Sequence, residues 1–385
     1  MYALVVVSAI GAISSLLYYV VGSFAALRFR RAAAPPPPAL AEPLPRLAML
    51  KPLYSLDQAN LANLETFLQT DYPSVSIVIG VATYPEWAVR EIAQLARRYP
   101  DKRIIVVTDA EAGCANRKIA KLIRMVDQVP EAEVFVVSDG DIVVDRDYLR
   151  RLVSELFSEA GVGVVTCAYR AQPTGSLAAR FEALYVNTDF APMVMLADLL
   201  EPLRHAYGAS IAFHRAAMES FGRFQALKDV LADDFFLGRM AAEHGFKVKL
   251  SHALVTIACG EARMAEFWTH QLRWARTYRT TRAESVATII VNGPLWGLIL
   301  MLASRFAPSA VLTFAIVIAA RVAMSALMID RVLGLKQMLG DSILVPVKDL
   351  VMAAIWFVSL LSNEVTWGGR RFRILSGGAM QEIDA

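Results

Sequence analysis

Residues 134–142 read Val-Phe-Val-Val-Ser-Asp-Gly-Asp-Ile, an apolar run that leads directly into two carboxylates. Such a short run with a turn signal behind it predicts a buried strand over 134–137. Asp139 and Asp141 then stand at the carboxyl end of that strand. Mg²⁺ and Mn²⁺ favour carboxylate oxygens together with phosphate oxygens. The motif therefore predicts a divalent-cation site that holds a diphosphate, with an ordinary acidic turn as the alternative.

Comparable runs lie on both sides of this strand and alternate with helical stretches. The expected strands are 74–79, 103–107, 134–137 and 162–167, and the expected helices are 86–98, 117–125 and 148–158. Strands that alternate with helices indicate βαβ units. The sequence predicts an α/β, Rossmann-like domain with a mostly parallel sheet. Ligands of such sheets bind beyond the carboxyl ends of the strands.

A second acidic pair, Asp233-Asp234, opens the stretch LADDFFLG at 231–238. Two acids before an apolar run are typical of a helix N-terminus, where they complement the helix dipole. The same pair offers a general base that takes a proton from an attacking hydroxyl. Both interpretations stay open on this stretch alone.

Basic residues follow at two further places. Arg273 and Trp274, within His270-Gln271-Leu272-Arg273-Trp274, suit a departing diphosphate and a packing surface, or a snorkelling arginine and a membrane-belt tryptophan. Asn116-Arg117-Lys118 stands at the start of an expected helix, where side chains and free N–H groups suit a phosphate. Residues 262–283 mix aromatic and basic residues and predict an interfacial amphipathic helix, aromatic toward lipid and basic toward head groups.

Long apolar stretches lie in the N-terminal and the C-terminal parts of the chain. Residues 1–27 carry no charged side chain and precede Arg28, Arg30 and Arg31, which predicts an anchor helix with the following residues in the cytoplasm. A proline run from Pro35 to Pro38 follows as an extended spacer.

Three C-terminal stretches are also long and apolar: 285–304, 306–329 with Arg321, and 342–363 with Lys348 and Asp349. Three spans would place Arg370, Arg371 and Arg373 outside, against the positive-inside rule, so either one stretch does not span or the rule fails. Three interpretations of the charges Arg321, Lys348 and Asp349 stay open: they line an acceptor channel, they pair with one another, or their segment lies at the membrane interface.

Composition narrows the function classes. The hydrophobic fraction is 56%, above the soluble range of about 45–50%, which favours a membrane protein. The net charge of only +3 argues against a nucleic-acid partner. The three cysteines are too few and too scattered for a disulfide framework or a zinc site.

Together these motifs resemble the ceramide-glucosyltransferase-like branch of the inverting glycosyltransferase families 2 and 21, and in detail the bacterial hopanoid-biosynthesis-associated type. The resemblance covers about residues 50–274 and, more loosely, the C-terminus. It rests on KPL at 51–53, NLETFLQTDYP at 63–73, NRK at 116–118, SDGDI at 138–142, GVGVVTCAYR at 161–170, LADDFFLG at 231–238 and HQLRWART at 270–277.

The resemblance implies a GT-A catalytic domain in the cytoplasm, a UDP-sugar donor, a divalent metal and a lipid acceptor. It makes Asp139 and Asp141 metal ligands, Asp139 also a nucleotide contact, and Asp234, Arg273 and Trp274 catalytic residues. The remaining residues that it places near the donor are Lys51, Glu86, Asn116, Lys118 and His270. Glu86 replaces an acid-rich element, and His270 stands where the family pattern has Gln or Arg.

The expected organisation is an anchor over 1–27, a proline-rich linker over 28–47, a catalytic domain over 48–260, an interfacial helix over 261–283 and a membrane bundle over 284–385. The expected reaction moves glucose or N-acetylglucosamine to a hopanoid polyol or a ceramide, with inversion, at a bacterial inner membrane. The alternatives are a ceramide glucosyltransferase proper, a processive polysaccharide synthase, which needs more membrane helices, and a non-enzymatic scaffold, against which the intact motifs argue.

Overall fold

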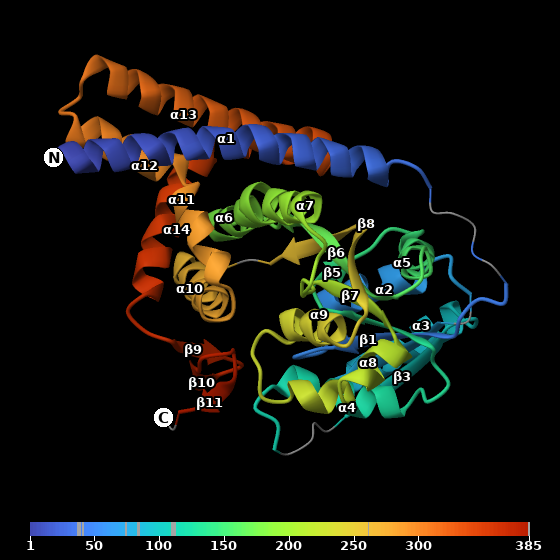
Figure 1. The fold of residues 1–385 in the computed structure, drawn as a ribbon. Helices are drawn as coiled ribbons and strands as arrows, with labels where there is room; N and C mark the ends of the chain where they lie inside the picture. Colours follow the sequence, from blue (N-terminus) through green and yellow to red (C-terminus); the bar gives the residue numbers. More distant parts are fainter. Residues whose placement is uncertain are drawn as a thin grey trace. The chain divides into compact units, whose positions relative to one another are not determined.

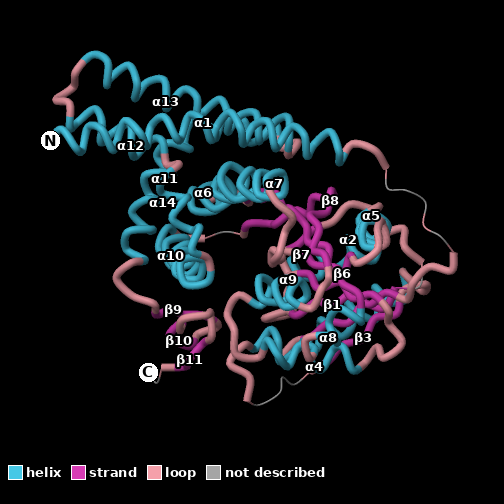
Figure 2. The backbone as a smooth tube through the Cα atoms, viewed as in Figure 1, coloured by secondary structure: helices cyan, strands magenta, loops and turns pink. Residues whose placement is uncertain are grey.

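The computed structural model describes residues 1–36, 40, 42–73, 75–82, 85–108, 113–260 and 262–383. The chain divides into two compact units, which Figures 1 and 2 show as ribbon and tube. Unit 1 comprises Met1–Ala32, Arg170–Leu200 and Cys259–Ala385, and unit 2 comprises Ala33–Tyr169 and Glu201–Ala258. Residues 170–200, placed in the catalytic domain by the sequence prediction, thus group with the membrane helices.

Unit 2 is built on a mixed sheet. In the described part of the chain its strands are ordered β3 (Arg103–Val107), β2 (Val75–Gly80), β1 (Leu47–Pro52), β4 (Val134–Ser138), β7 (Ser210–His214), β6 (Val162–Pro173), β8 (Lys247–Cys259) and β5 (Ile142–Val143). The β3-β2-β1-β4 half is parallel, whereas β4–β7, β7–β6 and β8–β5 pair antiparallel. The predicted α/β class is confirmed.

The register of the parallel half sets where a ligand can bind. Leu50 on β1 stands opposite both Val78 on β2 and Val137 on β4, so these strands end at one edge of the sheet. β1 and β4 are buried on both faces, which explains their uninterrupted apolar runs. The residues after β4 therefore emerge at the ligand-binding edge.

Helix α4 (Arg117–Asp127) shows how the local sequence builds this edge. Its apolar residues recur with helical spacing, and Ile119, Leu122 and Ile123 are buried on the side that packs on β1 and β2. Each such side chain contributes roughly 1.5–3 kcal/mol. The helix begins at the cap residue Asn116, which places Arg117 and Lys118 in its first turn.

The other helices of unit 2 are α2 (Gln58–Leu68), α3 (Glu86–Arg98), α5 (Tyr148–Leu156), α8 (Arg215–Ser220), η2 (Arg223–Leu227) and α9 (Asp233–Glu243). The predicted bounds of α3 and β3 agree with the structure. The prediction contained no strand at β1, β7 or β8, and Ser74, the first residue of an expected strand, lies outside the described residues.

Unit 1 is mainly helical. Its helices are α1 (Tyr2–Ala33), α6 (Leu177–Tyr185), η1 (Val186–Phe190), α7 (Ala191–Leu200), α10 (Met264–Thr281), η3 (Ala283–Val286), α11 (Ala287–Ile290), α12 (Gly293–Ala303), α13 (Pro308–Leu327), η4 (Met328–Val332), η5 (Lys336–Leu344) and α14 (Val345–Ser359). A small antiparallel sheet follows, with β9 (Glu364–Trp367), β10 (Arg370–Ile374) and β11 (Met380–Glu382). Helices α1 and α13 run side by side and share a core at Tyr19, Val317 and Met324 (Figure 1).

Within the described residues, three helices are long and apolar enough to cross a membrane: Tyr2–Ala33, Pro308–Val332 and Lys336–Ser359. The stretch 285–304, expected as a span, is instead broken into short helices, because Pro294 starts a new helix after α11. The 11 residues of α12 reach only about 16 Å at 1.5 Å per residue, half of a bilayer core. Two candidate C-terminal spans remain, as expected if one of the three apolar stretches does not span the membrane.

Helix α10 occupies the stretch expected to be interfacial, but part of its aromatic face does not point to lipid. Phe267 is buried against Phe181 of α6 and Ile355 of α14. The expectation that the aromatic residues of this helix face lipid is therefore wrong at Phe267.

Candidate functional site

The loop Asp139-Gly140-Asp141 follows β4 and is fixed by its backbone. The Asp139 N–H donates to the Ala209 carbonyl at 3.2 Å, and the Asp141 carbonyl accepts from the Ala258 N–H at 2.9 Å. Asn63 donates to the Gly140 carbonyl at 3.1 Å. A Cβ at position 140 would lie 2.6 Å from Asn60 Oδ1, so a larger residue here would displace the Asn60 side chain. The backbone is held by its neighbours while the side chain of Asp139 stays 40% exposed.

Lys118 joins this loop to the second acidic motif. Its ammonium lies 2.9 Å from Asp139 Oδ1 and 3.1 Å from Asp233 Oδ2. Burial lowers the pKa of Lys118, but the carboxylates of Asp139 and Asp233 outweigh burial and raise that pKa well above its ordinary value. Lys118 is therefore a permanent cation at this edge of the sheet.

Asn116 is fully buried and positions Lys118. Its Oδ1 accepts from the Lys118 and Ile119 N–H groups at 2.9 and 3.1 Å, which caps α4. Its Nδ2 donates to the Val230 carbonyl at 2.9 Å, just before the second acidic motif. The side chain thus ties α4 to the segment that leads into α9. Its expected nucleotide contact stays a prediction.

Asp233 and Asp234 are the first two residues of α9, and the cap residue is Ala232, without a side-chain hydrogen bond. The two carboxylates therefore lie in the first turn of α9, where negative charge complements the helix dipole, and neither residue is the cap. Gly208 packs beside Asp234, since an added Cβ there would lie 2.9 Å from Asp234 Oδ2 and would push the carboxylate aside. Gly208 was missing from the predicted site. Asp233 was predicted only as a member of the acidic pair, with Asp234 as the general base.

Lys51 lies beneath the loop and has no exposed surface. It donates to the Asp139 carbonyl and sits over the Phe67 ring, 4.1 Å from the centroid. Burial lowers the pKa of Lys51 to about 7, against the opposing effect of Asp141 and Asp139. Lys51 thus contacts the loop from inside the fold.

These residues together carry an excess of negative charge. Asp139, Asp141, Asp233 and Asp234 contribute four carboxylates, against which Lys118 is a permanent cation and Lys51, with a pKa of about 7, is only partly charged at neutral pH. The carboxylate oxygens and the excess of negative charge suit a divalent cation. No group of three or more His, Cys, Asp or Glu side chains among the described residues is arranged to hold a metal ion.

Glu86 is exposed in the first turn of α3, beyond the carboxyl end of β2. Its role at the donor stays a prediction. Thr83 and Tyr84, part of the same expected element, lie outside the described residues.

His270, Arg273 and Trp274 belong to unit 1, on α10. His270 Nδ1 lies 2.7 Å from Glu182 Oε1 of α6. The Trp274 ring packs 4.7 Å from His270 and 5.9 Å from Tyr185, centroid to centroid. Arg273 is half-buried on the same helix. Glu182 and Tyr185 were absent from the predicted site, because nothing in their local sequence marks them.

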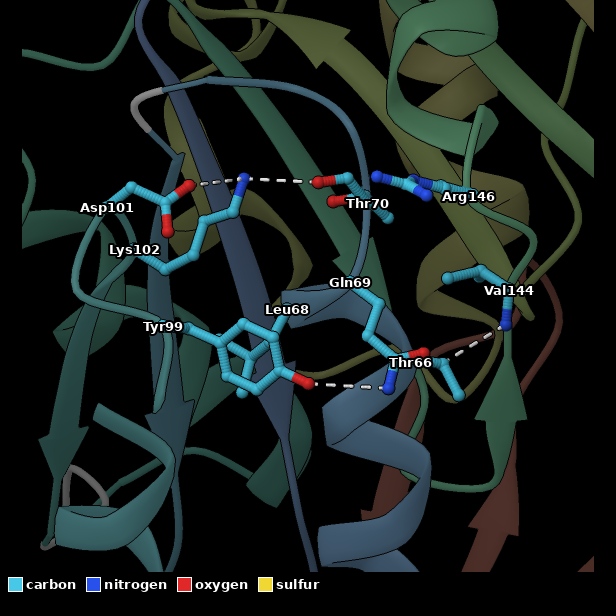
Figure 3. A pocket seen from close by; sticks show the side chains of 9 residues that line it. All are labelled: Thr66, Leu68, Gln69, Thr70, Tyr99, Asp101, Lys102, Val144 and Arg146. Atoms are coloured by element: carbon cyan, nitrogen blue, oxygen red, sulfur yellow. Dashed lines mark hydrogen bonds and ion pairs between the residues drawn. The ribbon is translucent and has the colours of Figure 1, made fainter. Parts of the chain in front are cut away.

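The hollow in Figure 3 lies elsewhere in unit 2 and has a volume of about 430 Å³. Lys102, just before β3, donates to the Thr70 carbonyl at 3.2 Å, and Gln69 Nε2 donates to Tyr99 Oη at 3.3 Å. The hollow adjoins the amino end of β3, opposite the edge that binds ligands in parallel sheets. Its polar groups bond one another, and we assign no site there.

The charges in the C-terminal apolar stretches pair with one another. Arg321 forms a two-pronged bond to Asp349 at 2.7 and 3.0 Å and contacts Asp189 at 3.0 Å. Lys348 contacts both carboxylates. Of the three interpretations of these charges, a channel lining, a pairing or a segment at the interface, the structure shows the pairing.

One protein family matches most of the chain. A protein-family model described as Glycosyl transferase family 21 matches residues 7–380. Ceramide glucosyltransferase 1 of Caenorhabditis elegans is 19% identical over 233 residues, which cover 60% of this chain and 50% of that protein. Ceramide glucosyltransferase 3 of the same organism is 21% identical with the same coverage. The chain spans about half the length of these curated relatives.

Two solved structures are also similar. The mannosyltransferase PcManGT from Pyrobaculum calidifontis, in complex with GDP-Man and Mn2+, has a TM-score of 0.49 and 19% identity and covers 91% of this chain and 99% of that one. GalNAc-T7 with UDP, GalNAc and Mn2+ has a TM-score of 0.43 and 11% identity and covers 66% of this chain and 52% of that one.

Proposed function

The chain belongs to glycosyltransferase family 21, and on that premise we propose that it transfers a hexose from a UDP-sugar to a hydroxyl of a membrane lipid. The hexose is glucose or N-acetylglucosamine, and the lipid is a hopanoid polyol or a ceramide. The α/β sheet and the family match agree with the expected GT-A fold. The names of the two relatives support ceramide, and the hopanoid rests on sequence resemblance.

The observation that carries the proposal is the negative cluster at the carboxyl ends of β1 and β4. Asp139 and Asp141 would hold a divalent metal together with the diphosphate oxygens of the donor. A metal bound there would neutralise charge on the departing diphosphate. Lys118 holds Asp139 and Asp233 in place as a permanent cation.

Asp234 is the proposed general base. Its carboxylate takes the proton of the lipid hydroxyl as that oxygen bonds to the anomeric carbon. The bond from that carbon to the diphosphate oxygen breaks on the opposite side, so the product is the inverted, β-linked glycoside. Gly208 leaves room for the carboxylate, since a methyl group there would meet it. Arg273 and Trp274 keep the catalytic roles that the sequence predicts.

Three helices are candidates for membrane spans, which supports a lipid acceptor. We place the protein in a bacterial inner membrane with unit 2 on the cytoplasmic side. The reason is that Arg28, Arg30 and Arg31 lie at the end of the first candidate span. A polysaccharide synthase would need more spans to build an export channel than the described residues provide.

A transfer assay on the full-length protein in nanodiscs tests the function. UDP-glucose, UDP-galactose and UDP-N-acetylglucosamine are each combined with a ceramide, a bacteriohopanepolyol and diacylglycerol, with and without EDTA. A β-linked glycolipid with one pair, lost on chelation and restored by Mn²⁺ or Mg²⁺, is the expected result. Absence of both product and UDP release with every pair would contradict the proposal and favour a scaffold.

A further inference from the structure

The seam between α6 and α10 combines polar and aromatic side chains in unit 1. Phe181 and Phe267 pack with Ile355 of α14, which belongs to the candidate span Lys336–Ser359. Glu182 and His270 pair 2.7 Å apart on this seam. The seam is thus built directly on a helix long and apolar enough to cross a membrane.

The Glu182 carboxylate fixes which nitrogen of His270 carries the proton. An ionised carboxylate only accepts hydrogen bonds, so Nδ1 of the imidazole must donate. In the neutral ring Nε2 then holds a lone pair. His270 is 36% exposed and Glu182 is 18% exposed, so the imidazole is the more accessible partner. A partner that holds one nitrogen as donor orients the other as an acceptor for a hydroxyl group.

Aromatic side chains line the same seam. Trp274 packs against His270, and Tyr185 packs against Trp274, with ring centroids 4.7 and 5.9 Å apart. Tryptophan and tyrosine are enriched where apolar lipid meets polar head groups. Gln271 is one helical turn from both Phe267 and Trp274, and within the described structure neither of its buried amide atoms has a hydrogen-bond partner. A buried amide without a partner destabilises the fold, so a polar group that binds there would satisfy it.

We propose that Glu182 and His270 form a head-group site for the lipid acceptor, in which His270 Nε2 accepts a hydrogen bond from a lipid hydroxyl and Glu182 is the positioning residue. The proposal rests on the proposed function and adds which part of unit 1 recognises the acceptor. It moves His270 from the donor, where sequence resemblance placed it, to the lipid. The ligand class is a membrane lipid with a hydroxylated head group.

The test is steady-state kinetics in nanodiscs with the donor and lipid that give product in the transfer assay. His270→Ala removes the acceptor atom, and we expect KM for the lipid to rise about five- to tenfold while KM for the donor stays within twofold. Glu182→Ala frees the imidazole and should raise the lipid KM about three- to fivefold. Glu182→Gln keeps an oxygen that accepts from Nδ1 and should restore the lipid KM to within twofold of the wild type.

Unit 2 offers a matched control, because His252 Nδ1 lies 3.1 Å from Glu155 Oε1 with the same 36% exposure of the histidine. His252→Ala should leave both KM values unchanged. Equal lipid KM values for wild type, His270→Ala and Glu182→Ala would overturn the proposal, and so would a rise in donor KM alone, which would return His270 to the nucleotide. An inactive wild type would instead count against the proposed function.

Discussion

Two charge clusters in the described part of the molecule differ in whether their charges cancel. The cluster in unit 1 is closed: Arg321 and Lys348 balance Asp189 and Asp349, and the charges cancel. The cluster in unit 2 is open: its four carboxylates face Lys118, which stays charged, and Lys51, which is only partly charged at neutral pH, so negative charge is in excess. The charges of the closed cluster neutralise one another, whereas the unbalanced carboxylates of the open cluster, at the edge of the sheet, favour binding of a cation.

The largest effect should come from the open cluster. Asp234→Asn keeps the shape of the side chain and removes the base, so kcat should fall at least about 10³-fold. Donor affinity, measured by calorimetry with UDP-sugar and Mn²⁺, should change less than threefold. Loss of donor binding would assign Asp234 to the donor and leave the base unidentified.

The closed cluster should respond in stability. Asp349→Asn leaves Arg321 and Lys348 with one carboxylate, and we expect a loss of about 3–5 kcal/mol, seen as a lower thermal midpoint in nanodiscs. The pair Arg321→Met with Asp349→Leu removes both charges and should cost less than Asp349→Leu alone. If the double variant is the less stable one, the network is not the self-satisfied set described above.

A methyl group tests the packing of the open cluster. Gly208→Ala places its Cβ against Asp234 Oδ2, and the displaced carboxylate should lower kcat about 10- to 100-fold with little change in thermal midpoint. Gly340→Ala is the matched control, because an added methyl there meets no atom within 4 Å. Full activity of Gly208→Ala would show that the Asp234 position is not critical.

The smallest effect concerns Lys51. Burial lowers the pKa of this side chain to about 7 from an ordinary value of 10.5. Between these values the unfolded chain binds the proton and the folded chain does not, so stability rises with pH. Between pH 7 and 9 this side chain should add about 2 kcal/mol to the free energy of unfolding. Lys51→Met should remove that rise, measured with EDTA present. Parallel pH profiles of the two proteins would show that Lys51 does not titrate in this range.

The sequence predicted local structure better than contacts between residues that lie far apart in the chain. The bounds of α3 and β3 follow from periodicity, which depends on near neighbours alone. The DGD loop and the Asp233-Asp234 pair were predicted because each stands directly beside an apolar run. Glu182 was missed because its partner His270 lies 88 positions away, and only the packing of α6 on α10 brings them together.

The same limit applied in the membrane helices. Arg321, Lys348 and Asp349 were conspicuous in apolar stretches, but the fourth member, Asp189, stands in a short π-helical segment about 130 residues earlier. A membrane span of 285–304 was predicted from composition. Pro294 and the turn before it divide that stretch, and composition over a window does not register such a break.

Helix α1 has a consequence for how the chain is made. Its core partners Val317 and Met324, and the Gly293 N–H that donates to Tyr19 Oη at 3.2 Å, are translated nearly 300 residues after it. Contacts so distant in sequence form late, and domains generally fold in order of synthesis. Unit 2 can therefore fold before the residues that contact α1 have been made. Until they are, α1 lacks its core partners Val317 and Met324.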